Sequence, residues 1–133
     1  MTARRLAHTR GHGVAALAGI GVAFAAVLAV RADPAWFGGG GAGPTALLFV
    51  STALAMLAVV LVLRRLVRLG GLTDAVGTVA ASALVADGLL MAFAPGLYGQ
   101  RPGALAGTAA WLLFGSGAAL GFAVLLERRA VEA

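Results

Sequence analysis

The sequence contains no cysteine and no lysine, and charged residues make up only 11% of its 133 positions. The absence of cysteine excludes disulfides, thiolate metal sites and thiol redox chemistry. Soluble domains carry about 25% charged residues, and a chain this short cannot bury so much apolar surface in one aqueous core. A hydrophobic content of 61% and a mean hydropathy of +0.98 therefore indicate a membrane protein whose apolar surface contacts lipid.

Groups that could carry catalysis are also scarce. The sequence has no paired carboxylates, no Ser/His/Asp set and no cluster of metal ligands. His8 and His12 would share a helix face, but no third ligand lies near them, so we assign them to a solvated N-terminal tail covering residues 1–13. The Gly38–Gly41 run lacks the Gly-Lys-Ser/Thr of a phosphate-binding loop and is read as a linker. We predict no enzyme activity, no metal and no cofactor.

Four apolar runs divide the chain, at residues 14–30, 45–63, 75–93 and 104–126. Each approaches or exceeds the length that crosses about 30 Å of hydrocarbon as a helix. Pro44 and Pro102 stand where helices tolerate proline, Thr73 or Asp74 is expected to cap the third helix, and Pro95 ends it. We predict one domain over residues 1–133, an all-α four-helix transmembrane bundle with short loops.

The first run has a second interpretation as a signal peptide, because it follows a basic start and precedes small residues near Ala32. Its length exceeds the usual apolar core of such a peptide, and three further spans follow. We favour an uncleaved span, with cleavage as the alternative.

The arginines predict the orientation. Eight arginines lie in the N-terminal segment, in the loop after the second span or near the C-terminus, which all fall on the same side of the membrane. Only Arg31 and Arg101 lie in the other two loops. The positive-inside rule then places both termini of this multi-pass membrane protein in the cytoplasm. Trp36, Phe37 and Tyr98 fall in the outer loops, where we expect them at the membrane–water interface. No basic stripe with interleaved aromatics is present, so the expected partner is the lipid bilayer and not a nucleic acid.

Asp87 is the sharpest feature of the sequence, because an aspartate near a helix centre costs about 2.5–3.5 kcal/mol on insertion scales. It should face the bundle or a wet cavity. Trp111 lies at a matching depth on the antiparallel fourth helix, so we predict that its indole N–H donates to the Asp87 carboxyl, with Thr108 and Ser116 as further polar neighbours. Two roles stay open for Asp87: a relay for protons or cations, or a neutral polar clamp that fixes helix register.

Small residues at helical spacing form a second pattern. Gly103 and Gly107, and again Gly117 and Gly121, make G-x-x-x-G pairs on the fourth span, and Ser82 belongs to a small stripe on the third. Such residues let helix backbones approach closely. The pattern predicts tight helix packing without defining a dimer interface.

The last two spans also carry a resemblance. Asp87-x5-Phe93-x-Pro95, followed by Ala110-Trp111-Leu112-Leu113 and a glycine-broken run, resembles a family of small bacterial four-span membrane proteins known only as a domain of unknown function. The resemblance implies a four-helix architecture and a bacterial inner-membrane site, and it brings no activity. Small multidrug transporters are similar in size, but their essential acid is a glutamate in the first span, and residues 14–30 contain no acid.

Two functions are therefore expected from the sequence. The first is a structural or accessory membrane subunit that packs against a second copy of itself or a larger membrane partner. The alternative is a small proton- or cation-coupled transporter or channel that uses Asp87. Transport would favour a homodimer, because four helices alone enclose little volume.

Overall fold

The computed structural model describes residues 3–32, 37, 41–66, 71–98 and 102–132, without the side chains of residues 3–12, 66 and 102–104. These residues form four long helices and one 3₁₀ turn, and no strand occurs among them. The elements are α1 (Ala3–Ala32), α3 (Ala42–Leu66), α4 (Leu72–Phe93), η1 (Pro95–Leu97) and α5 (Pro102–Glu132). All four helices are long and apolar enough to cross a membrane, which confirms the all-α four-helix bundle of a multi-pass membrane protein.

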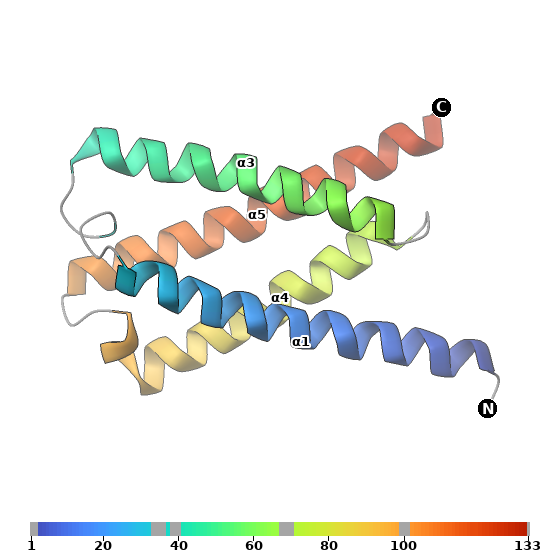
Figure 1. Ribbon diagram of the computed structural model, residues 1–133, viewed down its shortest axis with the longest axis horizontal. Coiled ribbons are helices and arrows are strands. Elements are labelled where there is room, and N and C mark those ends of the chain that lie inside the picture. Colours follow the sequence, from blue (N-terminus) through green and yellow to red (C-terminus); the bar gives the residue numbers. More distant parts are fainter. Residues whose placement is uncertain (1–2, 33–36, 38–40, 67–70, 99–101, 133) are drawn as a thin grey trace.

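The four helices alternate in direction, so that the N- and C-termini lie at the same end of the bundle (Figure 1). In this view α1 and α3 lie nearer the reader, and α4 and α5 lie behind them. α4 packs against both α1 and α5, and α5 packs against α3, whereas α1 and α3 make little contact with each other. The packing order is therefore a row, α1–α4–α5–α3, whose two end helices do not close into a ring.

The contact between α1 and α4 is the most extensive one between the described helices, and Gly19 allows the two backbones to come close. A Cβ atom at this position would overlap the Ser82 hydroxyl and the backbone carbonyl of Val79. The Ser82 hydroxyl donates to the Thr78 carbonyl at 2.8 Å, so its polar group is satisfied inside its own helix. Small residues on both helices thus let the backbones meet, as small-residue interfaces do in membrane bundles.

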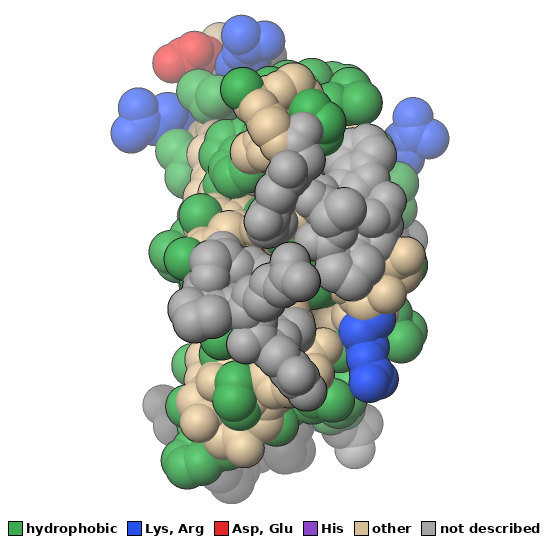
Figure 2. Space-filling model, turned by 90° about the vertical axis from the view of Figure 1, so that its left-hand side faces the viewer, with side chains coloured by type: hydrophobic (Ala, Val, Ile, Leu, Met, Phe, Trp, Pro, Cys, Tyr) green, Lys and Arg blue, Asp and Glu red, His purple; other side chains and the backbone are tan. Residues whose placement is uncertain are grey.

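Large apolar side chains cover the outside of the helices. Phe93 is 84% exposed and Leu17 is 69% exposed, and similar side chains occur on every long helix. Seen from the end where α1 finishes and α3 begins, hydrophobic side chains lie along both sides of the molecule, and charged side chains gather mainly near its top (Figure 2). A water-soluble monomer rarely exposes so large an apolar surface, whereas lipid accommodates it at no penalty.

Two helix starts differ from the sequence prediction. α1 begins at Ala3, so most of the predicted polar tail over residues 1–13 is helical. α4 begins at Leu72 after Gly71, and no side chain from its own first turn caps it. The prediction that Thr73 or Asp74 caps α4 was wrong, because the cap comes from α5: the Glu127 carboxylate accepts the Thr73 backbone N–H at 3.1 Å and also the Thr73 hydroxyl.

Candidate functional site

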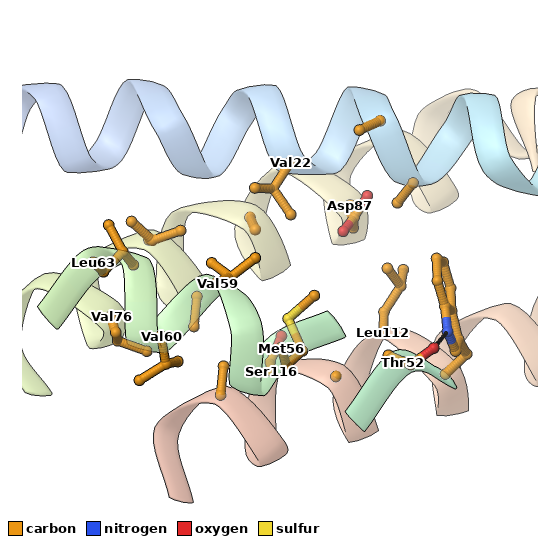
Figure 3. A pocket seen from close by; sticks show the side chains of 18 residues that line it. Val22, Thr52, Met56, Val59, Val60, Leu63, Val76, Asp87, Leu112 and Ser116 are labelled. Carbon is orange, nitrogen blue, oxygen red and sulfur yellow. Dashed lines mark hydrogen bonds between the residues drawn. The ribbon is translucent and has the colours of Figure 1, made fainter. Parts of the chain in front are cut away.

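A cavity of about 280 Å³ lies between the four helices, and every one of them contributes to its wall. α1 supplies Val22 and Ala25, α3 supplies Met56 and Val59, and α4 supplies Ala83 among others. The cavity exists because α1 and α3 make little contact, so the space in front of α4 and α5 stays unfilled. Side chains from α1 and α3 face one another across this space (Figure 3).

The polarity of the cavity wall changes along its length. Asp87 and Thr52 lie toward one end, and Leu63 and Val76 lie toward the other (Figure 3). Trp111 and Ser116 are the other lining residues with polar side-chain atoms. Among the described residues that line the cavity, Asp87 is the only ionisable one, and no arginine reaches it. The cavity is therefore an apolar slot with one acid near one end.

Asp87 is held in this wall by Tyr98. The Asp87 side chain is 3% exposed and the Tyr98 side chain 1% exposed, and the Tyr98 hydroxyl donates to Oδ1 of Asp87. Pro95 cannot continue α4, so the chain turns through η1, and the Tyr98 N–H donates to the Pro95 carbonyl at 3.1 Å. This turn directs the tyrosine ring back into the bundle. The prediction that Tyr98 lies at the membrane–water interface was therefore wrong.

Trp111 has a different partner from the one predicted. Its indole N–H donates to Oγ1 of Thr52 at 2.6 Å, and Thr52 in turn donates to the Leu48 carbonyl at 2.7 Å. The predicted bond from Trp111 to Asp87 was wrong. α5 packs between α3 and α4, and Trp111 bonds the threonine on the α3 side, whereas Asp87 on α4 is bonded by Tyr98.

Phe37 supports the Trp111 ring. The two ring centroids are 5.1 Å apart with an interplanar angle of 68°, an edge-to-face contact. Phe37 is only 8% exposed, so the predicted interfacial position for this side chain was also wrong. Trp36, predicted at the same interface, lies outside the described residues.

The remaining polar candidates separate in space. Ser116 lines the cavity beside Met56 (Figure 3). Thr108 is fully buried outside the cavity wall, and its hydroxyl has no hydrogen-bond partner among the described residues. The side chains of His8 and His12 lie outside the described part of the chain. Within the residues that are described, no three His, Asp or Glu side chains gather as they would around a metal ion.

The small-residue candidates also divide into two groups. A Cβ at Gly107 would overlap the backbone carbonyl of Phe37, so this glycine lies at a close contact, as Ser82 does opposite Gly19. Gly117 and Gly121 face open space, because no atom of the described residues lies within 4 Å of a Cβ added at either position. Gly103 lies among the residues whose side chains are not described.

Three residues of the site were missed at the sequence level: Thr52, Tyr98 and Phe37. Only Tyr98 left a usable signal, because it follows Asp87 by eleven residues and comes directly after a Pro-Gly-containing turn that can fold it back. The bond from Trp111 to Thr52 joins residues 59 positions apart, and no local pattern indicates it.

Comparison with known protein families, curated proteins and solved structures finds no match to this chain. The resemblance to a bacterial four-span family stays a prediction. What the fold and the site define is a class: a multi-pass membrane protein of four apolar helices that line an open cavity, with one acid among its described wall residues.

Proposed function

We propose that this chain is a small multi-pass protein of a bacterial inner membrane that binds a lipophilic small molecule in the cavity between its helices. The arginine distribution supports cytoplasmic termini. A small proton- or cation-coupled transporter that uses Asp87 must first bind its ligand there. The proposed binding is therefore compatible with the transport function expected as an alternative from the sequence.

The observation that carries the proposal is the composition of the cavity wall. Ligand sites are concave and mostly apolar, with a small number of placed polar groups, and helix bundles often hold them between their helices. Here side chains from four helices line a cavity of about 280 Å³, and the polar atoms of its wall lie mostly toward one end. A single chain provides this volume, so binding does not require the homodimer that the sequence favoured for transport.

The opening between α1 and α3 gives the ligand a route. These two helices make little contact, and both contribute residues to the cavity wall. Ala25 of α1 lies on this wall and is exposed at the same time. A lipophilic molecule dissolved in the bilayer can thus reach the cavity sideways, without first crossing the polar ends of the bundle.

Quenching of Trp111 fluorescence tests the binding proposal. The chain has two tryptophans, so Trp36→Phe leaves Trp111, a residue of the cavity wall, as the sole reporter. We expect 4-bromophenethyl alcohol, a neutral lipophilic probe with a heavy-atom quencher, to quench this protein saturably in lipid nanodiscs. Quenching that only rises in proportion to the probe content of the lipid would contradict the proposal.

A matched pair of variants locates the binding. Ala25→Phe places a ring at the cavity wall, whereas Ala29→Phe adds the same ring one turn further along α1, at an exposed position outside the wall. We expect saturable quenching to disappear in the first variant and to persist in the second. Equal behaviour of the two variants would place the probe elsewhere.

A structural or accessory subunit is the second candidate, and the bond between Tyr98 and Asp87 favours it. A buried acid that receives a hydrogen bond from its own hairpin also acts as a clamp between α4 and the turn that follows. Purification from native membranes in a mild detergent tests this role. A larger membrane protein recovered at fixed stoichiometry supports the subunit role, whereas recovery of this chain alone contradicts it.

A further inference from the structure

We infer that the cavity takes a lipophilic primary amine, with its ammonium group against the Asp87 carboxylate and its apolar part directed toward Leu63 and Val76. The inference rests on the proposed binding function, because it names the chemical class of the ligand for the same cavity.

Charge complementarity is the first argument. Asp87 is the only ionisable side chain among the described residues of the wall, and it is 3% exposed. A buried carboxylate is stable only when it is paired and hydrogen-bonded. An anionic ligand could not balance a carboxylate at this position, and a neutral ligand would leave the acid protonated and offer it only neutral hydrogen bonds. An ammonium group supplies both the balancing charge and three N–H donors.

Hydrogen-bonding capacity is the second argument. The Thr52 hydroxyl accepts from Trp111 and donates to the Leu48 carbonyl, so its one proton is used and one of its two acceptor positions remains. Tyr98 occupies Oδ1 of Asp87, and Oδ2 has no hydrogen-bond partner among the described residues. A carboxylate offers about four acceptor positions. Asp87 thus offers more remaining acceptor positions to a ligand donor than Thr52 does at this end of the cavity.

The shape of the cavity is the third argument. Asp87 and Val76 lie eleven residues apart on α4, which corresponds to about 16 Å along the helix. Between them the wall is built mostly from aliphatic side chains and Met56, with the Ser116 hydroxyl beside Met56 (Figure 3). A molecule with one cationic group at its end and an apolar body fits this arrangement of polarity.

The proton balance closes within the pair. An amine enters from the bilayer as its neutral base, and its nitrogen lone pair takes the proton of the Asp87 carboxyl. The O–H bond of the acid breaks and an N–H bond forms, leaving an ammonium–carboxylate pair with no net charge. No other reactant is needed, and the burial of net charge that makes ions costly in lipid is avoided.

A comparison of two probes tests the inference. 4-Bromophenethylamine and 4-bromophenethyl alcohol differ only in the amine and hydroxyl groups. Their dissociation constants are measured by Trp111 quenching in the Trp36→Phe protein in nanodiscs, and both are expressed per mole of probe in the lipid. Because hydrogen bonds to charged groups are stronger than neutral ones, we expect the amine to bind at least about tenfold more tightly.

Variants of two acids on α4 assign this preference to Asp87. Asp87→Asn is expected to bring the ratio of the two dissociation constants close to one. Asp74→Asn changes an exposed acid outside the cavity and is expected to keep the wild-type ratio. If Asp87→Asn does not fold, Tyr98→Phe keeps the carboxylate and is expected to keep the preference for the amine.

The outcomes separate the two proposals. Saturable binding of the alcohol with a ratio near one in the wild-type cavity, or in Tyr98→Phe, overturns the amine inference and leaves the binding function standing. The absence of saturable quenching by both probes overturns the binding function itself.

Discussion

The two neighbours of α1 in space show how side-chain size divides this bundle. Toward α4, Gly19 lets the backbones meet against Ser82 and Val79. Toward α3, α1 makes little contact, and a cavity of about 280 Å³ remains between the helices. One face of α1 thus holds the bundle together, and another face leaves room inside it. Close packing and open volume therefore lie on different faces of the same helix.

Gly19→Val disrupts the close contact between α1 and α4, and we expect it to have the largest effect on stability. Any side chain at Gly19 overlaps the Ser82 hydroxyl and the Val79 carbonyl, so α1 must move away from α4. Overpacking of this kind destabilises by about 3 kcal/mol. We expect a lower melting temperature in detergent. Gly21→Val is the matched control, because no atom of the described residues lies within 4 Å of an added Cβ there; an equal loss in both variants would contradict the close contact.

Tyr98→Phe tests the hydrogen bond that holds Asp87 in the cavity wall. It removes the donor to the buried Asp87 carboxyl, and leaving a buried acceptor unsatisfied costs about 1–3 kcal/mol. The free energy of unfolding should fall accordingly. Measuring Tyr98→Phe, Asp87→Asn and the double variant completes the test. Directly bonded residues give non-additive effects, so strictly additive losses would show that the two side chains do not interact.

Gly107→Ala tests a second close contact, between α5 and Phe37. Its Cβ overlaps the Phe37 carbonyl, and we expect a loss of about 1–2 kcal/mol, less than at Gly19 because Ala adds one methyl group where Val adds three carbon atoms. Gly121→Ala on the same helix meets open space and should leave the melting temperature nearly unchanged. A larger loss at Gly121 would reveal a contact with another chain, such as the dimer considered from the sequence.

Glu127→Gln should have the smallest effect. Glu127 accepts the Thr73 N–H at the start of α4, and a negative charge at a helix N-terminus adds about 0.3–1 kcal/mol. We expect a small fall in melting temperature at neutral pH, reduced further by added salt. Glu132→Gln, at the exposed end of α5, is the control and should show no change.

Much of the architecture could be predicted because the relevant physics is local. The apolar runs are long enough to require helices in lipid, and proline marks the end of α4 after Phe93. The start of α1 at Ala3 was missed, because the predicted boundary followed hydropathy and helices continue beyond the apolar stretch. The start of α4 was missed for a different reason: its capping carboxylate, Glu127, belongs to another helix.

The composition of the sequence by itself determined that this protein consists of four apolar helices, since a chain with so few charges and such long apolar runs can satisfy its backbone in lipid only as helices. The tertiary structure alone decided that Asp87 pairs with Tyr98 and Trp111 with Thr52, and that α1 and α3 stay apart to leave a cavity. The physical reason is that partner choice depends on how the helices rotate and pack around one another. Helical periodicity constrains the contacts within a helix and leaves those between helices undetermined.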